Sequence, residues 1–184
     1  MKSVVTLPLT LLLAATTMAQ TMAQTNSSVY TPLAEKQCKA IKGPDPQTND
    51  YEGHCRGVAG YTLIVTEGDL RQNVIVVTPR GAKHSLDLWD VISGGFSSVG
   101  AKAEWRMVHQ NKKLVPVALI IRYNANEDPE SPNKQSSYLA VTKITESEIC
   151  VTDKIMPGPK ANEEARVAGD AAANKPCLKK KQEQ

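Results

Sequence analysis

The residues with the clearest chemical potential lie in a glycine- and serine-rich segment, 94–100, which contains Ser97 and Ser98. A serine hydroxyl becomes a nucleophile when a histidine accepts its proton and a carboxylate orients that histidine. His84 and Asp87 precede the segment and supply both residue types. The segment begins a nucleophile elbow, G-x-S-x-G, but the second glycine comes one residue late and no helix is expected to follow. The pattern favours a solvated loop, and no catalytic residue is assigned.

A second candidate site is the segment 53–60, where three glycines surround His54 and Arg56 next to Cys55. Glycines allow a tight turn, and the two basic side chains then face solvent together. One interpretation is a contact site for an anion or a carboxylate. The other, which we favour, is a covalently fixed corner that leads into the first strand.

Two further basic residues, Arg106 and Arg122, lie on neighbouring expected strands together with Glu104. They are candidates for binding a ligand carboxylate. The alternative is that these charges pair with one another across the sheet, which contributes well under about 1 kcal/mol when the pair is exposed.

Four cysteines, an even number, indicate disulfides if the chain is exported. We expect the pairs Cys38–Cys55 and Cys150–Cys177, because each closes a short loop at low entropic cost. A zinc site is not favoured, since no CxxC or CxH spacing is present. No metal and no cofactor are therefore predicted.

The ends of the chain point to export. Segment 1–23 has the basic start, the apolar run and the small residues of a signal peptide, with cleavage after Ala19 or Ala23. No later segment reaches about 18 uninterrupted apolar residues, so no membrane span is expected in the mature chain. We divide the remainder into an extended lead-in, 24–50, a single globular domain, 51–178, and a basic tail, 179–184, which we expect to be free in solvent and solubilising.

Composition excludes several classes of partner. The formal charge of +3 comes from Lys2 and the lysines of the tail, so the body of the protein is nearly neutral. A nearly neutral body lacks the sustained basic stripe of a nucleic-acid reader. Aromatic residues make up only 4% of the chain, with a single phenylalanine, which argues against a function based on aromatic platforms.

The hydrophobic pattern predicts a mainly β protein of the α+β class. Segments 61–66 and 70–78 form one expected hairpin, and 138–144 and 149–155 form another. Ala103, Trp105 and Met107 should face one way while Glu104 and Arg106 face the other. We expect an antiparallel sheet of about six or seven strands, with 83–89 a short strand, 92–100 a loop and 114–121 a central strand. Pro116 indicates that one edge of that central strand is unpaired near its start.

One C-terminal helix completes the predicted fold. Alanines recur at helical spacing from Ala161 to Ala172, and two glutamates occupy the first turn, where the helix dipole favours them. A face made almost entirely of alanine gains little by burial. The Cys150–Cys177 bridge is expected to hold this helix close to the sheet.

The pattern F-x3-G-x3-EWR at 96–106, followed by PVALIIRY at 116–123, resembles a family of small exported bacterial proteins with no assigned activity. The likeness covers about the second half of the mature domain, including the two late cysteines. It implies a periplasmic or secreted setting in a Gram-negative organism. It supplies no catalytic residues.

We therefore expect a non-enzymatic exported domain that binds an unidentified ligand or protein of the bacterial envelope or the extracellular medium. One alternative is a secreted serine hydrolase that uses Ser97 or Ser98 with His84. A further alternative is an inhibitor of a secreted enzyme such as a lysozyme, presenting a rigid loop between strands.

Overall fold

The computed structural model describes residues 26–180, apart from 44–46, 48–49, 129 and 132. The predicted signal peptide therefore lies outside the described residues. The strands are β1 (Ser27–Pro32), β2 (Lys39–Lys42), β3 (Tyr51–Arg56), β4 (Thr62–Gly68), β5 (Arg71–Val77), β6 (Lys83–Ser85), β7 (Phe96–Gln110), β8 (Lys113–Asn126), β9 (Ser136–Ile144) and β10 (Ile149–Ile155). The helices are α1 (Leu88–Val91), α2 (Ala161–Asp170) and the short 3-10 turns η1 (Glu35–Gln37) and η2 (Ala172–Asn174).

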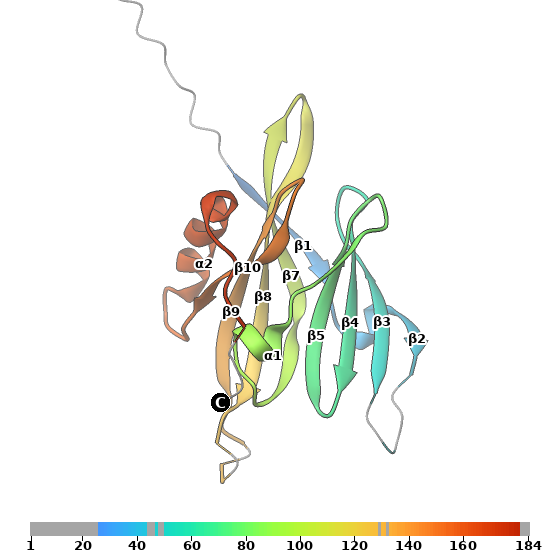
Figure 1. The fold of residues 1–184 in the computed structure, drawn as a ribbon, viewed down its shortest axis with the longest axis vertical. Helices are drawn as coiled ribbons and strands as arrows, with labels where there is room; N and C mark the ends of the chain where they lie inside the picture. The colour runs from blue at the N-terminus through green and yellow to red at the C-terminus, as the bar shows by residue number, and fades with distance from the viewer. Residues whose placement is uncertain (1–25, 44–46, 48–49, 129, 132, 181–184) are drawn as a thin grey trace, which may run out of the picture.

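The strands form one ten-stranded mixed sheet that divides into two halves. One half runs β6-β5-β4-β3-β2, and the other runs β1-β7-β8-β9-β10. The halves join where β5 and β7 pair in parallel at one position, Arg71 opposite Ser97. Strand β7 then leaves β5 and pairs with β1 along 102–107. Figure 1 shows the two halves next to each other, with β2–β5 on one side and β7–β10 on the other.

The two halves share one hydrophobic core. Ala103, Trp105 and Met107 are buried in it, which confirms the alternation predicted for this strand. The indole nitrogen of Trp105 donates a hydrogen bond to Thr31 Oγ1 at 2.8 Å, and its ring centroid lies 6.0 Å from that of Tyr61. A tryptophan with its N–H satisfied is suited to the centre of a core, where an unpaired donor would be costly.

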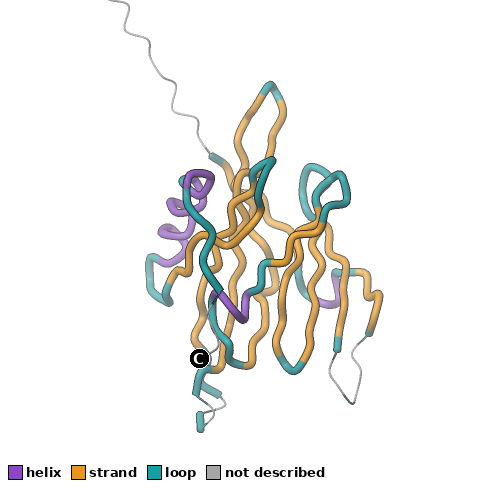
Figure 2. The backbone as a smooth tube through the Cα atoms, in the orientation of Figure 1, coloured by secondary structure: helices purple, strands orange, loops and turns teal. Residues whose placement is uncertain are grey.

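The opposite face of β8 and β9 is covered by α2, as predicted for the C-terminal helix (Figures 1 and 2). Its small side chains allow close approach to the sheet: the contact set is Ala118, Ile120, Leu139, Val141, Ala161, Ala165, Ala168 and Ala172. Val167, the one large apolar residue of the helix, is 72% exposed and faces away. Within the described residues, no helix is both long enough and apolar enough to cross a membrane.

Both predicted disulfides are present. Cys38–Cys55 closes a separation of 17 residues and ties the segment before β2 to β3. Cys150–Cys177 closes a separation of 27 residues and ties the chain after α2 back to β10. Next to this second bridge, Leu178 N donates to Val151 O at 2.8 Å, so the end of the domain lies along the last strand. Two disulfides are compatible with an oxidising compartment.

The prediction of six or seven antiparallel strands was wrong in number and in direction. The segment 24–50 is not simply an extended lead-in, because β1 within it pairs with β7 and β2 pairs with β3. The segment 92–100 is not all loop, since β7 begins at Phe96. The expected strand 83–89 ends at Ser85 and is followed by α1. These short elements have little periodicity of their own, and only their partners reveal them.

Two smaller expectations have different outcomes. On the β9 side, the register of β8 begins at Ala118, so Pro116 lies beyond the paired region as predicted. The basic tail was expected to be free in solvent. Instead, Lys180 Nζ lies 2.8 Å from Asp87 Oδ2 and 3.5 Å from Asp90 Oδ2, so this lysine contacts the start of α1.

Candidate functional site

Ser97, at the start of β7, and His84, on β6, lie beside opposite ends of β5. Ser97 pairs with Arg71 at the start of β5, whereas His84 pairs with Val76 near its end. Five residues of extended strand separate these two positions by about 16 Å. Ser97 Oγ is buried and lies 2.6 Å from the hydroxyl of Tyr123.

Asp87 has partners other than His84. Its carboxylate accepts a hydrogen bond from Ser85 Oγ at 2.6 Å and pairs with Lys180. Burial raises the pKa of Asp87, but the hydrogen bonds from Lys180 and Ser85 outweigh burial and hold the pKa below its usual value. The structure therefore does not assemble a serine triad from these residues.

The four residues predicted to bind a ligand lie in two separate places. His54 and Arg56 are exposed on β3, in the first half of the sheet, where His54 Nε2 lies 2.8 Å from Glu52 Oε1. Arg106 and Arg122 lie on β7 and β8, in the second half. The fold does not bring the two pairs together.

Arg106 is a buried partner of α2. It is 6% exposed, and its guanidinium forms two hydrogen bonds with Asp170, at 2.7 and 2.9 Å. Arg106 Nη1 also donates to Ser28 Oγ on β1. Burial raises the pKa of Asp170, but the hydrogen bond from Arg106 contributes to a net pKa below its usual value. Arg106 thus joins three elements, and its donors face protein groups instead of a cavity.

Glu104 has the matching role on the same face of β7. It is 8% exposed and accepts hydrogen bonds from Arg166 Nε at 2.7 Å and from Ser28 Oγ at 2.5 Å. Burial raises the pKa of Glu104, but the hydrogen bonds from Arg166 and Ser28 lower it by more, so the net pKa is below its usual value. The expected Glu104–Arg106 contact is weak, at 3.9 Å. Both charges pair mainly with the helix, and sequence reasoning missed these partners.

Arg122 contacts the other end of the same helix. It donates to Ser137 Oγ on β9 at 2.9 Å and to Asn162 Oδ1 on α2 at 3.1 Å. Of the four predicted binding residues, only Arg122 lines one of the described cavities, a hollow of about 210 Å³ beside α2. Its partners make it a connector between β8, β9 and α2.

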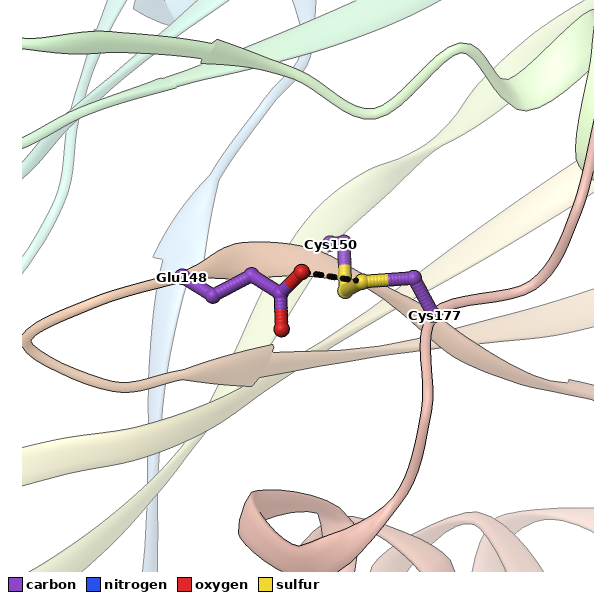
Figure 3. Close-up of side chains that lie close together, drawn as sticks. All are labelled: Glu148, Cys150 and Cys177. Carbon is purple, nitrogen blue, oxygen red and sulfur yellow. Dashed lines mark hydrogen bonds between the residues drawn. A yellow bond between two sulfur atoms is a disulfide. The ribbon is translucent and has the colours of Figure 1, made fainter.

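Glu148, Cys150 and Cys177 form the one group within the described ranges whose atoms are close enough to suggest metal ligands (Figure 3). Glu148 Oε1 lies 2.9 Å from the sulfur of Cys177. Both sulfurs belong to the disulfide, so neither carries a proton to donate nor a thiolate to bind a metal. The carboxylate is instead paired with the buried Lys143, at 2.5 Å.

A different surface has the properties of a binding site. It consists of Leu70, Arg71, Trp89, Gly94 and Phe96, and we refer to it as the Arg71 surface. Two adjoining open depressions, of about 460 and 530 Å³, share Arg71 and Gly94 in their walls. Two large apolar side chains in their walls are exposed, Trp89 at 37% and Phe96 at 50%. Leu70, which is 44% exposed, lies in the chain between Asp69 and Arg71, two residues that line the second depression. Exposed apolar side chains that gather at a depression are typical of interaction sites.

Arg71 lies at the centre of this surface and is held in place by its neighbours. Its Nε donates to Gly94 O at 2.9 Å, and its Nη1 donates to Asp69, at the carbonyl and at the carboxylate. Its guanidinium carbon lies 5.1 Å from the centroid of the Phe96 ring. This cation–π arrangement fixes both side chains while they remain partly exposed.

The turn that presents Leu70 is strained. Asp69 and Leu70 both have positive φ angles, 50° and 57°, in the tight turn between β4 and β5. Such turns favour asparagine or glycine, and a leucine there costs about 1–2 kcal/mol. Ser97 N donates to Leu70 O at 2.9 Å and holds this conformation in place. An exposed leucine in an unfavourable conformation has no evident value for stability, which points to function.

Two supports keep the surrounding loops in position. Glu127 accepts hydrogen bonds from Tyr138 at 2.6 Å and from Ser93 at 2.8 Å, and these bonds hold the pKa of its carboxyl below the usual value. Trp89 lies on α1, whose first amide, Leu88 N, donates to Asn73 Oδ1 at 3.1 Å. The depressions are therefore built on fixed loops.

The low aromatic content of the sequence gave no indication that Trp89 and Phe96 lie together on the Arg71 surface. The single phenylalanine and one of the two tryptophans lie on the same surface, although composition argued against an aromatic platform. One local signal of an exposed apolar side chain was present in the sequence. Leu70 follows Asp69 at an expected turn, a position where a small or polar residue is usual.

No family model matches this chain, and neither the curated proteins nor the solved structures contain a match.

Proposed function

We propose that this protein is an exported, non-enzymatic binding domain, and that the Arg71 surface contacts a protein partner in the bacterial envelope or the extracellular medium. The observation that carries the proposal is the exposure of Leu70, Trp89 and Phe96 around a fixed arginine. Tryptophan and arginine are among the residues most enriched in the energetically dominant positions of protein interfaces. The signal-like segment 1–23 and the two disulfides support the exported setting.

The form of the surface favours a peptide segment or a loop of a partner over an enclosed small molecule. The depressions are open and adjoin each other, so an extended chain can cross both. Asp69, Asp90 and Glu127 line them alongside the single cation, Arg71. This composition favours a segment with an apolar anchor and a flanking basic residue, because the rim then meets opposite charge.

A random peptide library displayed on phage tests the proposal directly. We expect peptides selected on the wild-type protein to lose at least about tenfold in affinity, or about 1.4 kcal/mol, on Phe96→Asp. Val167→Asp is the matched control, because Val167 is also an exposed apolar residue, at 72% against 50% for Phe96, but lies on α2. Binding that survives Phe96→Asp and Trp89→Ser alike would place the interaction elsewhere, and steady turnover of a substrate would contradict a non-enzymatic role.

A further inference from the structure

The β7–β8 hairpin extends beyond the rest of the sheet. Among the described strands, β1 pairs with β7 only as far as Met107, and β9 pairs with β8 only from Ala118 onwards. Residues 108–115 therefore pair with each other alone, and we refer to them as the ribbon. Figure 1 shows the ribbon projecting past the neighbouring strands. An isolated two-stranded ribbon is marginally stable in water, so stability does not explain this extension.

The ribbon has a basic tip with an apolar residue behind it. Lys112 lies in the turn, Lys113 follows it, and residues 109–114 are all exposed. No aspartate or glutamate occurs in the sequence from 105 to 126. Leu114 directly follows the lysines and is 38% exposed. The ribbon thus presents an apolar anchor next to positive charge.

The turn of the ribbon keeps a lysine where the backbone favours glycine. Asn111 and Lys112 have φ angles of 50° and 62°, and the second position of such a two-residue turn is usually glycine. Within the described ranges, neither Lys112 nor Lys113 forms an ion pair that would compensate for this conformation. The charge at the tip is therefore kept against the local preference and is available to a partner.

The Arg71 surface has the complementary charge. The carboxylates in its walls outnumber the one cation there, Arg71, and belong to Asp69, Asp90 and Glu127. The Asp69 side chain is 83% exposed although it pairs with Arg71. Lys180 lies 3.5 Å from Asp90 but is shared with Asp87, so the excess of negative charge remains. The surface therefore attracts a segment that carries lysines at its tip.

The ribbon and the Arg71 surface of one copy are too far apart to meet. Phe96 begins β7 and Gln110 ends it, so the two regions lie about 45 Å apart along this strand. Figure 1 likewise shows the ribbon at one end of the fold and the β4–β5 turn at the other. The ribbon reaches about 13 Å past Met107, so its tip can enter the depressions of a second copy before the bodies of the two copies meet.

We propose that the ribbon of one copy of this protein docks on the Arg71 surface of a second copy, with Leu114 against Trp89 and Phe96 and the two lysines beside the carboxylates. This inference rests on the proposed function, because it names the partner of the Arg71 surface. Each copy offers one ribbon and one surface, so the contact is head to tail and generates a chain or a ring instead of a two-fold dimer.

Sedimentation velocity of the purified protein over about 10–500 µM tests this assignment. We expect the weight-average mass to rise with protein concentration and to fall as salt rises, because lysines and carboxylates meet in the contact. Lys112→Glu with Lys113→Glu should weaken self-association by at least about tenfold. Lys39→Glu with Lys83→Glu is the matched control, since these exposed lysines of β2 and β6 give the same change in charge. The control should associate like the wild type.

Mixing two deficient variants separates docking from folding. Phe96→Ser removes the exposed ring of the Arg71 surface and keeps the ribbon, whereas Lys112→Glu with Lys113→Glu changes the ribbon and keeps the surface. Each variant should be monomeric alone. Their equimolar mixture should form a dimer that grows no further, because only one competent ribbon and one competent surface remain to be joined. A misfolded variant could not restore association in this way.

Wild-type protein that stays monomeric up to about 500 µM, or association that Lys112→Glu with Lys113→Glu leaves unchanged, would overturn the ribbon as the occupant. In either case, displayed peptides that lose affinity on Phe96→Asp would still support a binding role for the Arg71 surface. Loss of neither self-association nor peptide binding on substitution of Phe96 would remove both proposals.

Discussion

Arg106 and Glu104 show how single charged residues are accommodated against a sheet. Both are more than nine-tenths buried, and the desolvation that this entails is offset only because each has several hydrogen-bond partners. Arg166 and Asp170 are four residues apart on α2 and match Glu104 and Arg106, which are two apart on β7. The match fixes the helix in one register along the strand.

Asp170→Asn should make stability less dependent on pH. The pKa of Asp170 is lower in the folded protein than the value of about 3.9 expected when unfolded. Its contribution is therefore present above pH 4 and is lost as pH falls through the lower folded pKa. We expect the variant to lose about 2 kcal/mol of unfolding free energy at pH 7 and much less near pH 2, as measured by urea denaturation.

The exposed Glu163→Gln is the control for this experiment, because Glu163 lies on the same helix away from Arg106. An equal loss in Asp170→Asn at both pH values would mean that the ion pair is not the source of the stability.

At the scale of elements, α2 depends on the small size of its inward face. Ala168 is 8% exposed against the sheet, whereas its neighbour Val167 is 72% exposed. Ala168→Leu should lower the unfolding free energy by about 1–3 kcal/mol, because three added carbons must displace packed neighbours. Val167→Leu is the adjacent control and should change stability by less than about 0.5 kcal/mol. Similar unfolding free energies for the two variants in denaturant titrations would show that the helix can move away from the sheet.

The β4–β5 turn should display a conflict between stability and binding. Leu70→Gly relieves a positive φ and is expected to raise the unfolding free energy by about 0.5–1 kcal/mol. It also removes an apolar side chain from the Arg71 surface, so selected peptides should bind more weakly. Lys112→Gly relieves the φ of 62° in the β7–β8 turn and should stabilise without affecting binding. Unchanged peptide affinity in Leu70→Gly would remove Leu70 from the proposed interface.

At the scale of the whole molecule, the second disulfide connects the last strand to the chain after α2. Removing it by Cys150→Ala with Cys177→Ala should lower the unfolding free energy by about 3–4 kcal/mol for the loop it closes. Amide hydrogen exchange in α2 should also accelerate, because its alanine face gains little from burial.

The matched variant for that experiment is Cys38→Ala with Cys55→Ala. It should cost a similar free energy, about 3 kcal/mol, and leave exchange in α2 unchanged because this bridge lies in the other half of the sheet. Unaltered α2 protection in the Cys150 and Cys177 variant would show that packing alone holds the helix.

One of the tail lysines that contribute to the positive net charge of the chain makes a contact within the fold. The tail was expected to be merely solubilising, yet Lys180 pairs with Asp87 and Asp90 at α1. Because α1 carries Trp89, Lys180 helps to position one side of the Arg71 surface. The contact is exposed to solvent and should weaken as salt rises.

Features that depend on one segment of the chain could be predicted from the sequence, whereas contacts between distant segments could not. The alternation around Trp105, the alanine spacing of α2 and both disulfides followed from periods and loop lengths within one segment. The partners of Arg106 and Glu104 did not follow, since they lie more than 60 residues away on a helix. Strand number was underestimated because β1 and β2 lie in the segment interpreted as a lead-in, and β3 covers the start of the segment interpreted as a corner. These short strands are defined by their pairing partners, which the local pattern does not reveal.

Taken alone, the residues predicted a mainly β, doubly bridged chain with a small-faced C-terminal helix, and a signal peptide at 1–23 that stays a prediction. Those properties depend on spacing, which can be read without knowing which strands are neighbours. Tertiary structure placed Trp89 and Phe96 beside Arg71, in the walls of two adjoining depressions. Phe96 lies next to the one parallel contact between β5 and β7, Arg71 opposite Ser97, which is a long-range pairing that no local pattern encodes.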